Sequence, residues 1–359
     1  MTATLQRRFD VSKNLPLVFL VAVMVPVTIF LIVQLFQDPW EFFQTLMKAL
    51  ALGSVYAILA LGFVLIFKAT QTVNFSQGAL GMAGALFLSY LIVDEHIPFT
   101  TVKNPLATID PHWLAWGLCV IVALAFAALL GLVVERLAIR PMVGEPLFSV
   151  AVITLGLEIV LRVFSIDSVK IQFRSLAVPW GNKAFKVGGE NGADINWSYI
   201  AAIATAALAF VAVYVFYRSR MGIAMRAVAQ DQEAAMAQGI NIGRVFAIAW
   251  GAGAVLAAIG GIFAVQPPVK QTGSIDQETV FVAFRALPAV ILGGLDSVQG
   301  ALVGGLLVGL AEIYAGQYLS GNTDILGAGY PVIVPYVVMI IGLLVRPYGL
   351  FGTPEIRRV

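Results

Sequence analysis

Apolar runs long enough to cross a lipid bilayer recur along nearly the whole chain. A membrane-spanning helix needs about 20 apolar residues, and several of the runs are short or interrupted by Gly and Pro. The ten predicted segments are 17–36, 44–67, 75–93, 113–135, 147–166, 197–217, 246–266, 280–294, 299–316 and 329–345. Charged residues are only 12% of the 359 residues, about half the fraction typical of soluble domains. The pattern predicts an all-α polytopic membrane protein with one transmembrane domain over 1–359.

Positive charges indicate how these segments are oriented. Ten crossings place both termini on one side, and the loops of that side carry the larger share of Lys and Arg. The inner set is Arg7, Arg8, Lys13, Lys68, Arg136, Arg140, Arg218, Arg220, Arg226, Arg244, Arg346, Arg357 and Arg358; the outer set is Lys103, Lys170, Arg174, Lys183, Lys186 and Lys270. The positive-inside rule therefore predicts cytoplasmic N and C termini.

Two of the predicted outer loops are long. They span about 94–112 and 167–196, and they are rich in Pro, Gly, Asn and acidic residues, with possible short strands around 169–188. Two interpretations stay open: a solvated connection, or a docking surface for an external partner.

The predicted inner loop at about 218–245 differs from the other loops. It is polar, basic, rich in Ala and Gln and helix-prone, and it lies between two apolar segments. Such a long polar segment in an otherwise apolar chain favours contact with another protein. The alternative is an ordinary solvated amphipathic loop.

A polar interruption separates the second and third apolar segments. Asn74 is a good helix N-cap, and Gln77 stands three residues later, as in a capping box. Backbone groups exposed by such a break must be satisfied within protein or a water-filled cavity. Asn74, Ser76, Gln77, Gly78 and Gly81 are thus candidates for lining or gating a pathway, and a plain helix start at the cytoplasmic surface is the alternative.

Residues 77–84 (QGALGMAG) and 299–306 (QGALVGGL) are alike, and each begins a predicted segment that runs outward. An internal duplication is a common origin of transporter folds. Pro288 removes a helical hydrogen bond, and small residues nearby permit close helix packing. The second set of pathway candidates is therefore Pro288, Gly293, Gly294, Gln299 and Gly300, with packing inside one subunit as the alternative to a subunit seam.

Few charges lie inside the predicted segments. Glu158 and Arg162 stand four residues apart, Glu first, which is the favourable order for an ion pair on one helix. Lys48, Arg285 and Glu312 are expected near the outer interface, where long side chains reach water. Without a dense relay of acids and histidines, a proton-driven pump is disfavoured.

Signatures of an enzyme are missing from the sequence. The chain has no Gly-Lys dipeptide and hence no Walker A loop. Both histidines fall in one outer loop, which excludes a Ser-His site within the membrane. The lone Cys119 and these histidines give no basis for a metal site. We expect no catalytic residue and no cofactor on this chain, so any ATP hydrolysis takes place on another chain.

Three blocks of the sequence resemble one transporter family. The first is 52–62 (LGSVYAILALG) with 74–78 (NFSQG), the second is 218–222 (RSRMG) with 226–231 (RAVAQD) and 233–235 (EAA), and the third is 292–301 (LGGLDSVQGA). Together they resemble the permeases of branched-chain amino-acid ABC transporters, over roughly 45–350, and the second block is closer to the H-type subunit than to the M-type.

The resemblance implies a permease subunit of an ATP-driven importer in the bacterial inner membrane, embedded in lipid and not bound to nucleic acid. The implied partners are an M-type permease subunit, two cytoplasmic ATPases that carry ATP and Mg²⁺, and an extracytoplasmic substrate-binding protein. Glu233, Ala234, Ala235 and Gly239 match the EAA coupling loop that docks on the ATPase. Arg226 and Asp231 are expected at the rim of that contact.

The sequence departs from the family pattern in two places. The family commonly has His-Gly-acid where this chain has Gln77, Gly78 and Ala79, and Pro where it has Gln232. The first change bears on the substrate, because urea and short-amide permeases share much of the pattern. Branched-chain amino acids are the expected substrates, urea or short amides the alternative. An ATPase-independent secondary transporter and a non-transporting scaffold are the rivals from other classes.

Overall fold

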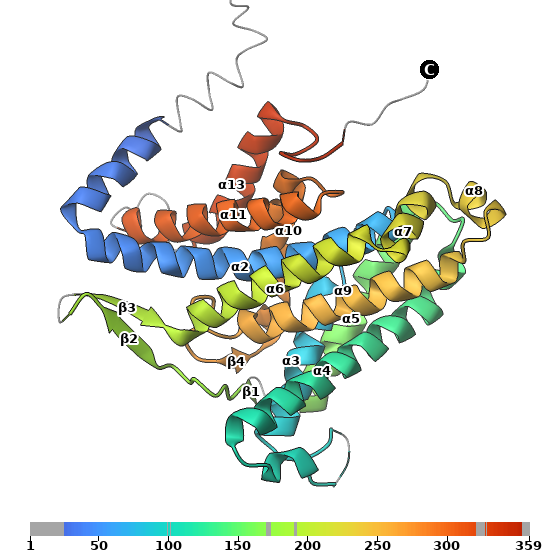
Figure 1. Ribbon diagram of the computed structural model, residues 1–359, viewed down its shortest axis with the longest axis horizontal. Coiled ribbons are helices and arrows are strands. Elements are labelled where there is room, and N and C mark those ends of the chain that lie inside the picture. The colour runs from blue at the N-terminus through green and yellow to red at the C-terminus, as the bar shows by residue number, and fades with distance from the viewer. Residues whose placement is uncertain are drawn as a thin grey trace, which may run out of the picture.

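The computed structural model describes residues 25–353 except 99, 101, 170–173, 190–191, 321–326 and 328, and it leaves out the side chains of 107, 108, 168 and 169. Within these residues the chain is mainly helical (Figure 1). The helices are Val25–Gln37, α2 (Pro39–Thr70), α3 (Gln77–Ile92), α4 (His112–Val134), α5 (Leu147–Val169), α6 (Trp197–Arg218), α7 (Arg220–Gln230), α8 (Gln232–Ala237), α9 (Ile242–Ala264), α10 (Phe281–Gly293), α11 (Val298–Tyr318) and α13 (Tyr330–Val345). Short irregular turns are η1 (Pro105–Thr108), η2 (Glu135–Ile139), η3 (Arg140–Met142) and η4 (Gln277–Val280).

Each predicted apolar segment coincides with a helix in the described part of the chain. Six helices are long and apolar enough to cross a membrane: α2, α4 with its η2–η3 extension, α5, α6, α9 and α11. Val25–Gln37, α3 and α13 are shorter apolar helices, and α10 is a 13-residue helix with Pro288 inside it. The all-α polytopic class is therefore confirmed. The first predicted segment begins at residue 17, outside the described residues.

The centre of the molecule is α2. In its most apolar window 89% of the residues are buried, and α11, α9, α6 and α10 pack around it. Small residues allow the close contact with α11: a Cβ added at Gly305 would lie 2.6 Å from the backbone nitrogen of Ala57. Such close approach is what small-residue faces permit in membrane helices. Gly304 likewise packs on α10, so these glycines join helices of the same chain.

Two small antiparallel sheets lie at the end of the molecule opposite α8 (Figure 1). β1 (Arg174–Ser175) pairs with β4 (Ser274–Ile275), and β2 (Ala184–Val187) pairs with β3 (Ala193–Asn196). β1 and β2 fall in the range where the sequence suggested strands. β4 lay outside that range, because the partner of β1 is about 100 residues away along the chain.

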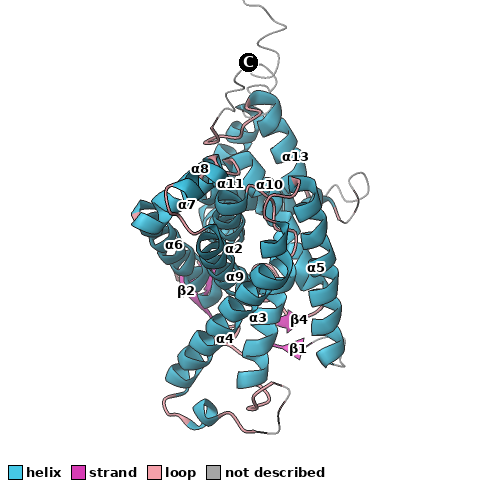
Figure 2. Cartoon of the chain, turned by 90° about the vertical axis from the view of Figure 1, so that its right-hand side faces the viewer, coloured by secondary structure: helices cyan, strands magenta, loops and turns pink. Residues whose placement is uncertain are grey.

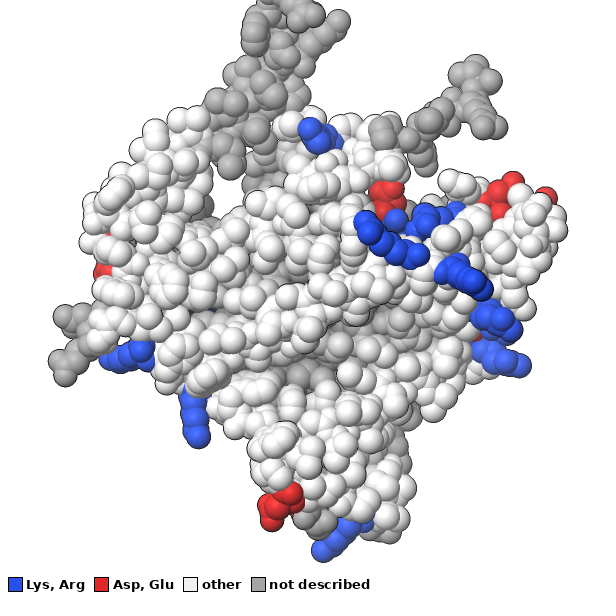
Figure 3. Space-filling model, in the orientation of Figure 1, with Lys and Arg blue, Asp and Glu red and all other residues white. Residues whose placement is uncertain are grey.

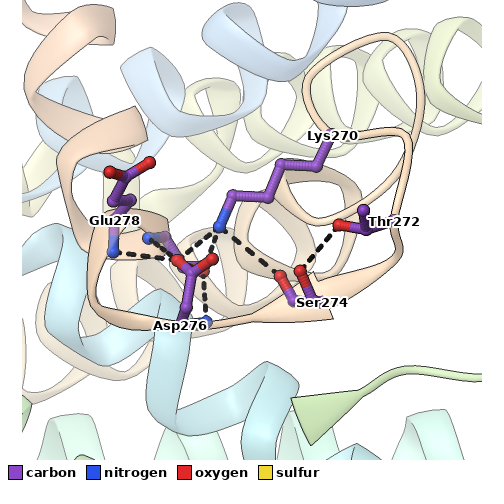
Figure 4. A network of polar contacts seen from close by, with 6 residues as sticks. Lys270, Thr272, Ser274, Asp276 and Glu278 are labelled. Atoms are coloured by element: carbon purple, nitrogen blue, oxygen red, sulfur yellow. Dashed lines mark hydrogen bonds and ion pairs between the residues drawn. The ribbon is translucent and has the colours of Figure 1, made fainter. Parts of the chain in front are cut away.

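A hydrogen-bonded network holds the loop that follows β4 (Figure 4). Lys270 bonds to Asp276, and its Nζ also donates to Thr279 Oγ1 at 3.1 Å. Asp276 Oδ1 accepts from the backbone nitrogens of Glu278 (2.9 Å) and Thr279 (3.2 Å), which caps η4. The network thereby fixes η4, whose Val280 lies against Gly78 of α3.

Lys and Arg side chains gather at the end of the molecule that carries α7 and α8 (Figure 3). This is the end that the charge pattern assigned to the cytoplasm. The placement of each end relative to the membrane stays a prediction.

Candidate functional site

The segment predicted to couple to an ATPase forms two short helices that project from the end of the molecule (Figure 1). α7 and α8 are separated by Asp231, whose extended backbone ends one helix and caps the next. Asp231 Oδ1 accepts from the backbone nitrogen of Ala234 at 2.9 Å, the bond expected of an N-cap. Asp231 thus shapes the element, a role that the sequence analysis had not assigned to it.

α8 ends at Ala237, and Gly239, two residues beyond it, has φ +80°. The backbone nitrogens of Gly239 and Ile240 donate to the carbonyls of Met236 (2.9 Å) and Ala235 (3.0 Å), the pattern of a left-handed helix end. Ala235 is buried, whereas Glu233 and Ala234 are exposed. Gly239 thus permits the turn that follows α8, and the exposed side of α8 carries Glu233, Ala234 and Met236.

Arg226 is exposed, and it also connects α7 to the end of α6. Its Nη1 donates a hydrogen bond to the backbone oxygen of Tyr217 at 2.8 Å. The ammonium group of Lys68 lies over the ring of Tyr217, 4.7 Å from the ring centroid, and makes a cation–π contact with it. Movement of α7 is therefore connected to α6 and α2 through Arg226.

The polar interruption between α2 and α3 lies inside the protein. Asn74, Ser76 and Gln77 are all 0% exposed, and Gln77 Nε2 donates to the carbonyl of Gly253 at 3.3 Å, in the middle of α9. The break is thus not at the surface, and its polar groups are satisfied within the chain, as a membrane interior requires.

The hydrogen bonds at the break differ from the expected capping box. α3 begins at Gln77, and Ser76 is the N-cap residue. Asn74 Nδ2 donates to Gln77 Oε1 (3.1 Å), while Asn74 Oδ1 accepts from the Ser76 nitrogen (3.0 Å) and hydroxyl (2.6 Å). The two side chains bond to each other because α3 starts two residues later than the sequence suggested.

The second set of candidates lies apart from the break. Pro288, Gly293, Gly294 and Gly300 are buried where α10 ends and α11 begins, and Gln299 is exposed. Gln77 and Gln299, the matching residues of the internal similarity, therefore occupy unlike environments. Helix backbones of the same chain cover these glycines, and a pathway role for this set stays a prediction.

Glu158 and Arg162 form an ion pair on α5. Arg162 Nε lies 2.9 Å from Glu158 Oε1, and the side chains are 26% and 7% exposed. The same helix face carries Thr154 and Ser165, at 0% and 5% exposure. Thr154 Oγ1 accepts from the Phe75 nitrogen at 3.1 Å, which places this polar face beside the break.

A second polar group lies deep in the core. The Tyr56 hydroxyl donates to Glu312 Oε2 at 2.6 Å, and Arg285 of α10 is close enough to act on both electrostatically. Glu312 is 7% exposed, so this chain buries it, and its expected position near the outer interface stays a prediction. Lys48 is half-buried in the first third of α2.

The sequence analysis missed Thr154 and Tyr56. Thr154 had a detectable signal: with Glu158, Arg162 and Ser165 it recurs at spacings of four, four and three, which puts all four on one helix face. Tyr56 had no detectable signal in the sequence, because its partner Glu312 is 256 residues away.

Comparison with known proteins gives the family. Residues 45–343 match the family described as "Branched-chain amino acid transport system / permease component". The high-affinity branched-chain amino acid transport system permease protein LivH of Salmonella typhimurium is 31% identical over 323 residues, covering 89% of this chain and 98% of that protein. The corresponding protein BraD of Pseudomonas aeruginosa is 30% identical over 328 residues, covering 89% and 99%.

One solved structure is also similar. PsaBC from Streptococcus pneumoniae in complex with Fab gives a TM-score of 0.45 at 12% identity, covering 90% of this chain and 98% of that one. This likeness is too low to carry an argument. The family match covers most of the chain, and with the membrane helices it settles the classification: this protein belongs to the family of branched-chain amino acid transport permeases.

Proposed function

We propose that this chain is the permease subunit of an ATP-driven importer that moves branched-chain amino acids across the bacterial inner membrane. The family match and the membrane helices support the transport role. Branched-chain amino acids are favoured over urea or short amides as substrates, because the similar proteins LivH and BraD are permeases of branched-chain amino acid transport systems.

The observation that carries the ATP-driven part is the exposed element formed by α7 and α8. α8 is capped at both ends, by Asp231 and Gly239, so a rigid helix end projects from the positively charged end of the molecule (Figure 3). Glu233 and Ala234 are exposed there. A cytoplasmic ATPase that grips this element would move α7, and Arg226 would pass the movement to α6 through the Tyr217 carbonyl.

The remaining partners follow from the same proposal. A second permease subunit, two ATPases that hold ATP and Mg²⁺, and an external substrate-binding protein complete the importer. The two small sheets, β1–β4 and β2–β3, offer a surface for the binding protein at the end opposite α8.

The test is to purify the chain with its natural partners and to measure ATPase activity and leucine uptake in nanodiscs. The variant Glu233→Arg with Gly239→Trp should lose the ATPases and uptake, because it changes the exposed face and forbids φ +80° at the helix end. Leu208→Ala, in the middle of α6 and away from both α8 and the two sheets, changes a side chain that is 71% exposed; it is the control and should leave both activities intact.

Leucine uptake that persists without any bound ATPase would instead establish a secondary transporter. Bound ATPases without any uptake, in the wild type with its partners present, would establish a scaffold.

A further inference from the structure

A groove lies over α3 because its two neighbours do not close over it. α4 and α5 both pack on α3 but make little contact with each other, and Figure 2 shows the three helices side by side. The cavity between them has a volume of about 70 Å³. Its walls are apolar and are formed mainly by Leu86, Phe87, Phe126, Leu130, Leu161 and Phe164. The rings of Phe87 and Phe126 stack with their centroids 4.1 Å apart, which makes one wall firm.

The groove opens on a face that this chain leaves uncovered. Only 28% of the most apolar window of α4 and 17% of that of α5 are buried, and Phe164 at the rim of the groove is 63% exposed. An empty space beside an apolar wall loses the contacts that the wall would otherwise make, and water does not occupy cavities of this apolar kind. An apolar chain from outside the protein is therefore the occupant that suits the groove.

The groove becomes polar at one end. Ala83 and Tyr90 both line it, so it follows α3 for about 10 Å at 1.5 Å per residue. At Tyr90 it continues into an open pocket of about 430 Å³, which is also lined by Asp94, His96 and Thr100. Tyr90 lies near the end of α3 that is predicted to face outward. Polarity thus changes along the helix from apolar at depth to polar at the outer end, as it does along a phospholipid.

An ion pair between Arg174 and Asp94 sets the charge of the polar pocket. Arg174 is turned inward: its side chain is 10% exposed, its guanidinium carbon lies 3.8 Å from the centroid of the Tyr90 ring, and its Nε donates to Ser89 Oγ at 2.9 Å. The side chain of Asp94 is 41% exposed and lines the pocket. The pocket therefore presents a carboxylate, which forms charge-assisted bonds with ammonium groups and disfavours anionic ones.

We propose that the groove between α3, α4 and α5 is a phospholipid site, in which an acyl chain fills the apolar part and Asp94 binds the ammonium group of a phosphatidylethanolamine headgroup. Lipid tails are as apolar as the walls of the groove, so the tail alone does not select one lipid over another. The headgroup pocket supplies the selection. The site lies apart from the α7–α8 element and goes beyond the proposed import function, because it does not depend on the substrate or on an ATPase.

The test uses the protein purified with its natural partners, in nanodiscs of equal phosphatidylethanolamine and phosphatidylglycerol. A trace of phosphatidylethanolamine with a diazirine in its acyl chain is cross-linked by light, and mass spectrometry maps the labelled residues. We expect labelling of the groove to exceed labelling around Leu208, which is 71% exposed on α6 and serves as the reference for bulk lipid. Unlabelled phosphatidylethanolamine should compete about two- to fivefold better than phosphatidylglycerol, as expected for a partly exposed ion pair.

Two variants with matched controls separate the tail from the headgroup. Leu161→Trp fills the groove and should reduce its labelling to the level at Leu208, whereas Val160→Trp, at a residue that is 63% exposed beside the groove, should not. Asp94→Asn should abolish the preference for phosphatidylethanolamine. Glu95→Gln removes an exposed carboxylate that does not line the pocket and should retain the preference.

Three results would overturn the proposal. Labelling of the wild-type groove no stronger than at Leu208 would show bulk lipid only, and this comparison holds even if Leu161→Trp fails to fold. A groove that is labelled in the isolated chain but not in the complex would belong to a partner protein. Competition that is equal for the two lipids, or unchanged in Asp94→Asn, would remove the headgroup pocket.

Discussion

α2 and α5 are both apolar helices that carry polar groups, yet they meet opposite surroundings. Their mean hydropathies are 2.5 and 2.1, but 89% of the α2 window is buried and only 17% of the α5 window. Hydropathy alone does not separate them. α2 finds its neighbours within the chain, whereas α5 leaves most of its surface to lipid or to another subunit.

Their polar groups show the same contrast. Tyr56 of α2 bonds across to Glu312 of α11, so the polar contact joins two helices of the core. Glu158 and Arg162 bond along one helix, and Arg162 also lies over the ring of Phe281, the first residue of α10, 5.8 Å from its centroid. The polar contact of α5 with another helix is thus a cation–π contact, whereas that of α2 is a hydrogen bond between two side chains.

The largest expected effect is on close packing at the centre. Gly305→Leu places side-chain atoms where the Ala57 backbone lies, and such overpacking should cost about 3 kcal/mol, the upper end of the usual range, because backbone cannot move aside as a side chain can. We expect almost no folded protein by size-exclusion chromatography in detergent. Gly156→Leu on α5 is the matched control, because a Cβ there meets nothing within 4 Å. A folded yield for Gly305→Leu equal to that of Gly156→Leu would break the comparison.

An intermediate effect is expected where one polar contact joins two helices. Tyr56→Phe leaves the buried Glu312 oxygen without its donor, which should cost about 1–3 kcal/mol and lower the Tm of the purified chain. Glu158→Gln on α5 keeps a side-chain oxygen that can accept from Arg162 and should lower the Tm less, because the bond lies within one helix. The comparison sharpens if only Tyr56→Phe lowers the Tm clearly, and it fails if Glu158→Gln lowers the Tm as much as Tyr56→Phe.

A similar cost in stability is expected at the start of α8, where it affects that helix alone. Asp231→Ala removes the N-cap bond to Ala234, which should cost about 1 kcal/mol and weaken ATPase binding several-fold. Asp231→Asn keeps an N-cap oxygen and should bind as the wild type does. Equal binding by the Ala and Asn variants, in a pull-down with the partner ATPase, would contradict a role for the cap.

The smallest effect is expected where α5 meets the buried break. Thr154→Val removes the oxygen that accepts from Phe75, and hydrogen bonds between membrane helices contribute about 0.6 kcal/mol on average. We expect a small decrease in Tm and a larger decrease in uptake, because the break is held less firmly. Thr154→Ser retains the hydroxyl and should behave as wild type.

The sequence predicted the elements better than their contacts. Long apolar runs identified each long helix, and residues 218–245 were recognised as a polar, helix-prone loop, although the N-cap at Asp231 was not predicted. The buried position of Asn74 and Gln77 was not predictable, because it depends on Gly253 of α9. Likewise, the bond between Glu312 and Tyr56 was not predictable, because it depends on α11 packing against α2. Each of these contacts joins residues more than 150 positions apart, beyond any local pattern.

The central claim is that a partner ATPase binds the element formed by α7 and α8, and cysteine accessibility tests it most directly. The single cysteine of the sequence, Cys119, is buried and can be replaced by Ala, after which one cysteine is placed at Glu233, which is exposed on α8. We predict that a water-soluble methanethiosulfonate labels Glu233→Cys in the isolated chain and that bound ATPases slow this labelling. Labelling of Glu233→Cys that bound ATPases do not slow would contradict the account.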